Sequence, residues 1–177
     1  MEPIFTKPEL SRYTQRSFPP YRFLPFRPDI PHPRNDPQGH SYGEEDEYLS
    51  SFTEADWHDC EPYLYGVDLF NHGYWWEAHE AWETVWLAAG RETQEGKFVQ
   101  GLIQLAGAQL KRFTAVPRGA HQLTESGVAK LAVAKGVYLG IEVALLMTEI
   151  RRCLEEDAGV YPRIELQFSN SPKIPYE

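Results

Sequence analysis

A short stretch of the chain, residues 69–86, concentrates side chains that could carry chemistry. It places His79, Glu80 and Glu83 among four of the chain's five tryptophans. On a helix, residues four positions apart share a face, so the imidazole of His79 and the carboxylate of Glu83 would meet. Such a pair suits general acid–base catalysis and also the binding of a divalent metal ion. His79, Glu80 and Glu83 are therefore candidate catalytic residues, and His79 and Glu83 are candidate metal ligands.

The donor set restricts the metal without specifying one. A histidine with two glutamates can hold iron, manganese or zinc. The segment HEAWE departs from the HExxH zinc motif, because Glu83 stands where that motif has its second histidine. The ligands that one helix supplies are also too few, and His58, His72 and His121 are the spare candidates. A divalent metal is thus compatible with the sequence, and the cofactor remains open.

The tryptophans predict which way this helix faces. At about 100° per residue, Trp75, Trp82 and Trp86 fall on one side, with His79 in the middle of it. Glu83 lies one turn further along the edge. This arrangement predicts that His79 is mostly buried and that it needs polar partners inside the protein.

Two further glutamates lie off this face. Glu80 flanks it and is expected to be half exposed. Glu77 falls on the opposite side of the helix, where it is expected to be an ordinary solvated charge.

A second helix offers those partners. Residues 93–113 are apolar in almost every direction, which is typical of a central, buried helix. One stripe of this helix is polar and carries Gln100, Gln104 and Lys111. Buried polar groups without partners cost about 1–3 kcal/mol each, so we expect the stripe to meet the polar face that carries His79.

Two classes of function remain open for this cluster. It is either the site of an enzyme, or a core network inside a module that binds a helix, a peptide or a small cationic ligand. The aromatic side chains and the polar stripe would line the groove in either case. The candidate binding residues are Gln100, Gln104, Lys111, Trp86 and Trp82.

The elements that position these residues are helices. The spacing predicts an all-α fold of about five helices joined by short connections. Gly73 and Gly90 end the first two. The predicted helices cover residues 62–72, 74–89, 93–113, 118–135 and 137–157.

Composition divides the chain into three parts. Residues 1–45 form a Pro- and aromatic-rich extended arm, 46–158 a helical domain, and 159–177 an extended C-terminal arm. The first arm holds nine of the 14 prolines, so it cannot be helical. We expect it to lie along the domain through apolar anchors, and the alternative is a free tail that docks on another protein. The expected anchors are Phe18, Tyr21, Phe23, Leu24, Phe26 and Ile30.

Charge and cysteine content limit the binding partners and the cellular compartment that the sequence predicts. A net charge of −9 without a basic cluster predicts that the protein binds neither nucleic acid nor a membrane surface. Two distant cysteines and no visible signal peptide predict a soluble, cytoplasmic protein with reduced thiols. A small-molecule or protein partner remains unknown, and a homodimer is compatible with the sequence.

The motif FNHGYWWEAHEAWETVW, followed by QGLIQLAGA, resembles the family called domain of unknown function 309. The resemblance covers roughly residues 60–155. It implies a small all-helical fold that is an irregular array rather than a regular bundle, and it implies no activity, because none is established for the family. Family members often carry a histidine near the end of the second motif helix, where this chain has Leu110 and Lys111. This departure argues against a metal site that depends on that histidine.

Overall fold

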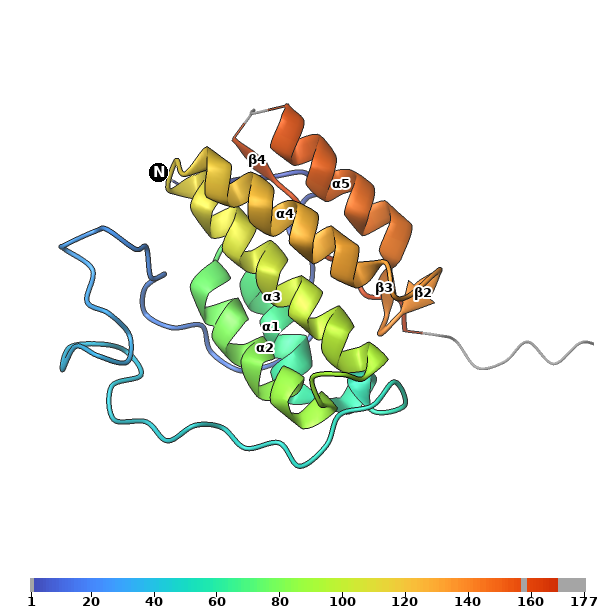
Figure 1. Ribbon diagram of the computed structural model, residues 1–177. Coiled ribbons are helices and arrows are strands. Elements are labelled where there is room, and N and C mark those ends of the chain that lie inside the picture. The colour runs from blue at the N-terminus through green and yellow to red at the C-terminus, as the bar shows by residue number, and fades with distance from the viewer. Residues whose placement is uncertain (1, 157–158, 169–177) are drawn as a thin grey trace, which may run out of the picture.

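Five α-helices provide most of the regular structure in the computed structural model, which describes residues 2–156 and 159–168 (Figure 1). The predicted all-α fold is confirmed. The helices are α1 (Glu61–Asn71), α2 (Trp75–Ala89), α3 (Gln94–Phe113), α4 (Pro117–Leu131) and α5 (Val143–Glu155), preceded by one 3-10 turn, η1 (Trp57–Asp59).

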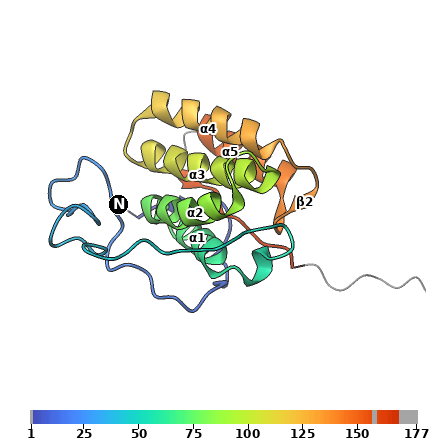
Figure 2. The same cartoon turned by 60° about the horizontal axis from the view of Figure 1, so that its bottom comes forward.

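The helices stack in chain order. In Figure 2, α4 lies over α3, which lies over α2 and α1, and α5 packs against α4. The central position predicted for α3 is confirmed, since this helix contacts both α2 and α4.

Glycines set two of the helix contacts. A Cβ atom on Gly101 of α3 would lie 3.0 Å from the carbonyl oxygen of Gly127 on α4, so these two backbones nearly touch. On α1, a Cβ atom on Gly66 would lie 2.2 Å from Nε1 of Trp82. The Gly66 contact requires the absence of a side chain, and the Gly101 contact leaves little room for a Cβ atom.

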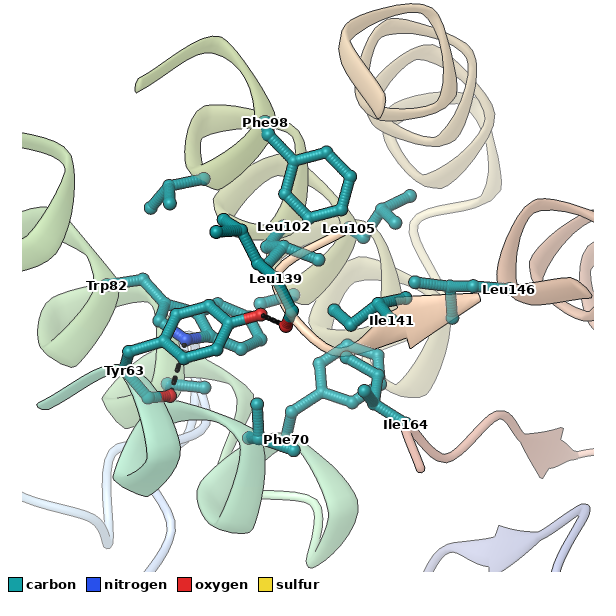
Figure 3. Close-up of a cluster of buried hydrophobic side chains, with 14 of the residues drawn as sticks. Tyr63, Phe70, Trp82, Phe98, Leu102, Leu105, Leu139, Ile141, Leu146 and Ile164 are labelled. Atoms are coloured by element: carbon teal, nitrogen blue, oxygen red, sulfur yellow. Dashed lines mark hydrogen bonds between the residues drawn. The ribbon is translucent and has the colours of Figure 1, made fainter. Parts of the chain in front are cut away.

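The core lies where α1, α2 and α3 meet the segment before α5 (Figure 3). Tyr63 joins these parts, because its hydroxyl donates a hydrogen bond to the carbonyl of Leu139 at 2.7 Å. Its own carbonyl accepts a hydrogen bond from Nε1 of Trp82 at 3.2 Å. Both cysteines, Cys60 and Cys153, are buried and free, as expected of small core residues.

The predicted start of the last helix is wrong. Two short strands, β2 (Val137–Tyr138) and β3 (Ile141–Glu142), form an antiparallel hairpin in place of its first six residues. Its two-residue loop, Leu139 and Gly140, has φ values of 47° and 76°, which a right-handed helix does not allow. The α5 helix therefore starts at Val143, and its predicted end at Asp157 lies outside the described residues.

Two other helix boundaries differ from the prediction. The α4 helix ends at Leu131, four residues before its expected end. Residues 46–56 contain no helix, so the helical region starts later than predicted. Among the described residues the sheets have only two strands each, and no helix there is long and apolar enough to cross a membrane.

The two ends of the described chain meet. Strand β1 (Ile4–Phe5) pairs in parallel with β4 (Val160–Tyr161). The C-terminal segment then runs back over the core with Ile164 and Leu166 buried. The rest of that arm, residues 169–177, lies outside the described residues.

The N-terminal arm is free of helix and lies against α1 and α2, and it sweeps around them at one end of the molecule (Figure 1). Phe18 stacks on Tyr74 with ring centroids 5.1 Å apart, and Phe23 meets Trp76 edge-on at 5.4 Å. The expectation that Phe26 is an anchor is wrong, because its side chain is 87% exposed.

A buried aspartate on α1 fixes the start of this arm. Asp68 accepts hydrogen bonds from the backbone N–H groups of Tyr13 (2.8 Å) and Thr14 (3.0 Å). It also accepts one from the Thr14 hydroxyl at 2.7 Å, and the guanidinium of Arg12 lies 3.5 Å away. Asp68 is 1% exposed, so these contacts satisfy a carboxylate that water does not reach.

Candidate functional site

Helix α2 carries the predicted cluster. A glycine with positive φ lies at each end of this helix. Gly73 has φ 80° just before the helix, and Gly90 has φ 86° just after it. This left-handed geometry is accessible to glycine at low cost, so the sequence itself sets the length of the helix.

His79 lies at the edge of the buried face and not at its centre, contrary to the prediction. Its side chain is 32% exposed. Ala78 and Val85 are fully buried together with Trp75 and Trp82, and they move the centre of the buried arc away from His79. The predicted orientation of the helix followed its large aromatic rings, whereas the smaller side chains of Ala78 and Val85 are buried just as completely.

The imidazole lies between the two predicted carboxylates. Nδ1 of His79 is 3.3 Å from a carboxylate oxygen of Glu80, and Nε2 is 3.5 Å from one of Glu83. Glu80 is 25% exposed, and its other oxygen lies 3.0 Å from Nε of Arg34 in the N-terminal arm. We call His79, Glu80 and Glu83 the edge cluster.

The edge cluster has the spacing of a metal-binding group. One nitrogen of His79 and one oxygen from each glutamate all lie within 4.8 Å of one another. In the part of the chain that the structure describes, no other set of three His, Cys, Asp or Glu residues comes this close. These side chains are 25–46% exposed, so an ion can reach them from solvent.

The neighbouring carboxylates change the titration of His79. Burial alone would lower the pKa of the imidazole, but the hydrogen bond with Glu80 and the charges of Glu83 and Glu80 outweigh it. The pKa of His79 is therefore raised above its ordinary value, and a metal ion has to displace a proton that is held more firmly than usual.

In the described part of the chain, no hydrogen bond or ion pair joins the predicted binding residues to the edge cluster. Trp82 is fully buried, and its indole N–H is bonded to the backbone of Tyr63, so it belongs to the core. Trp86 is half-buried, with the guanidinium of Arg91 4.8 Å from its ring.

The polar stripe of α3 stays separate. Gln100, Gln104 and Lys111 are half-buried along the helix, and within the described residues no hydrogen bond joins His79 to either glutamine. The carbonyl oxygen of the Gln104 side chain is buried without a partner there. The expected network across α2 and α3 is therefore replaced by contacts within α2 and to the arm.

Glu77, expected to be solvated, is buried instead. It is 5% exposed, and its Oε1 accepts a hydrogen bond from the backbone N–H of Phe23 at 2.7 Å. The same oxygen lies 3.2 Å from Nε2 of His40, whose Nδ1 is 2.9 Å from the hydroxyl of Ser41. The N-terminal arm covers this face of α2. The face would be exposed to solvent if the helix were considered without the arm.

A pocket of about 250 Å³ opens between the arm and the helices at this point. Its polar wall includes Glu77, His40 and Ser41, with Arg34 and Glu80 at the side of the edge cluster. The sequence pattern does not indicate the three arm residues, because an extended segment has no helical period that marks its inward side. Their only signal was polar side chains placed among apolar anchors.

The model of the family described as domain of unknown function 309 matches residues 63–123. The resemblance predicted from the sequence is thereby confirmed over these residues. A search of curated proteins gave no match. The matched segment contains the whole edge cluster and Glu77, whereas His40 and Ser41 lie outside it.

Proposed function

We propose that this protein binds a divalent transition-metal ion at the edge cluster. The observation that carries the proposal is the approach of one nitrogen and two carboxylate oxygens within 4.8 Å on one accessible edge of α2. Ligands of an ion bound at about 2.0–2.2 Å are separated by roughly 3–4 Å, and small rotations of exposed side chains reach this spacing.

The donor types define the class of metal. One imidazole and two carboxylates suit Zn²⁺, Mn²⁺ or Fe²⁺ better than Ca²⁺, which prefers oxygen ligands throughout. Arg34, through its contact with Glu80, would orient one ligand from outside the coordination sphere. Three protein ligands leave coordination positions free for water or for a substrate group, as in catalytic rather than structural sites.

The test is metal titration of the tag-free full chain. Isothermal titration calorimetry with Zn²⁺ and Mn²⁺ should give one site per chain, and either His79→Ala or Glu83→Gln should weaken it at least about tenfold. His121→Ala, which removes an exposed histidine on α4, is the matched control and should change nothing. Equal affinity in wild type and His79→Ala would contradict the proposal.

A further inference from the structure

A hydrogen-bonded relay between the arm and α2 lies outside the proposed metal site. It consists of Ser41, His40 and Glu77, joined by contacts of 2.9 Å and 3.2 Å. The side chains of His40 and Glu77 are 5% and 4% exposed. A hydroxyl within hydrogen-bond reach of a base, which is in turn oriented by a carboxylate, is the arrangement that activates a serine nucleophile.

The contacts of Glu77 define the tautomer of His40. The carboxylate is an acceptor, and it already accepts the N–H of Phe23 through the same oxygen. Nε2 of His40 therefore carries the proton and donates it to Glu77, which leaves the lone pair of Nδ1 to accept the hydroxyl proton of Ser41. In this state His40 is ready to take that proton.

The pocket between the arm and the helices provides space for a substrate beside the relay. Ser41, His40 and Glu77 all line the 250 Å³ space, and Phe18 and Trp76 supply apolar walls. Arg16 and Arg34 are the cations that line the same pocket, where a developing negative charge would meet them, and both also pair with carboxylates. The second oxygen of Glu77 is buried without a partner in the described residues, so this carboxylate is not neutralised by an ion pair on that side.

From this geometry we infer that the pocket is an acyl-transfer site that hydrolyses small carboxylic esters, with Ser41 as nucleophile. The hydroxyl oxygen bonds to the ester carbonyl carbon while its proton moves to Nδ1 of His40. The bond to the leaving alcohol then breaks, and the alcohol takes that proton. Water, losing a proton to His40, attacks the acyl-Ser41 ester, releases the acid and restores the serine.

The arm completes this site. Glu77 belongs to the segment that matches the family model, whereas His40 and Ser41 come from the arm outside it. None of the three residues belongs to the edge cluster, which meets the pocket through Glu80 and its partner Arg34.

A fluorophosphonate probe tests the nucleophile without a known substrate. The full chain is incubated with the probe, and its peptides are sequenced by mass spectrometry. The expected result is one adduct on Ser41, with none on the exposed Ser51, and a labelling rate that falls about 100-fold in His40→Gln. A folded wild-type protein left unmodified at Ser41 would overturn the inference.

A cysteine variant keeps the test decisive if His40→Gln loosens the arm. Ser41→Cys leaves His40 and Glu77 in place, and its thiol should react with iodoacetamide at pH 7 at least about tenfold faster than the thiol of Ser51→Cys. The native Cys60 and Cys153 are distinguished by their peptides, and burial raises the pKa of both thiols. Equal rates at the two positions would mean that His40 and Glu77 only hold the arm.

Discussion

The protonation of His79 couples the edge cluster to pH. Because the folded protein raises the pKa of this imidazole, the ionised form is stabilised relative to the unfolded chain. This contribution to stability is fully present below the ordinary histidine pKa of about 6.5. It is lost as the pH rises through the higher pKa of the folded state.

Chemical denaturation in chelator should reveal this dependence. The difference in unfolding free energy between wild type and His79→Gln is expected to be largest at low pH and to shrink as the pH rises above about 6.5. An NMR titration should also show the pKa of His79 falling in Glu80→Gln. A difference that grows with pH would contradict the assigned ion pairs.

Glu77 gives a second prediction at this scale. Replacement with alanine leaves the N–H of Phe23 and the ring of His40 without their acceptor, so Glu77→Ala should lower the unfolding free energy by about 1–3 kcal/mol. Glu92→Ala removes an exposed glutamate and should stay within about 0.5 kcal/mol of wild type. Urea denaturation of the two variants makes the comparison, and equal stabilities would mean that Glu77 is solvated after all.

These two residues show what the sequence could and could not predict about the site. The spacing correctly brought His79 within reach of Glu83, because a four-residue separation is a local property of a helix. The burial of Glu77 depends on residues 37 and 54 positions away. No helical period contains that information.

At the scale of elements, the helix packing depends on positions without side chains. Gly66→Ala would press a Cβ atom into the fully buried indole of Trp82, and it should destabilise the protein by about 1–3 kcal/mol through overpacking. Gly119→Ala on α4 also makes a close contact, but against the flexible side chain of Lys111. It should be neutral or stabilising, because alanine favours helix. Thermal unfolding of both variants distinguishes these outcomes, and a similar loss in both would assign the effect to the backbone.

Local end signals and contacts between elements explain which helix boundaries were predicted correctly and which were wrong. The α2 and α3 helices were predicted within one residue at each end, because glycines and a threonine cap mark those ends. The segment before α5 has apolar residues at spacings that a helix also allows. Its conformation follows from Gly140, where a Cβ atom would lie 2.5 Å from the ring of Trp57, and this contact between distant residues is not visible in the sequence.

For the whole molecule, the arm is a structural part of the domain. Deleting residues 1–43 removes the partners of two buried carboxylates, Asp68 and Glu77. The melting temperature should fall by more than about 5 °C, since each orphaned group costs about 1–3 kcal/mol. Phe26→Ser alters an exposed side chain of the same arm and should leave the melting temperature within about 2 °C of the wild-type value. An unchanged melting temperature in the deletion variant would show that the arm is only a tether.

The pairing of β1 with β4 has a consequence for synthesis on the ribosome. Ile4 and Phe5 leave the exit tunnel early, but their partners Val160 and Tyr161 are translated last among the described elements. At roughly 5–20 residues per second, the first strand waits on the order of ten to thirty seconds for its partner. Helices α1 to α4 can assemble during this delay, so β1 is made before them and reaches its final place after them.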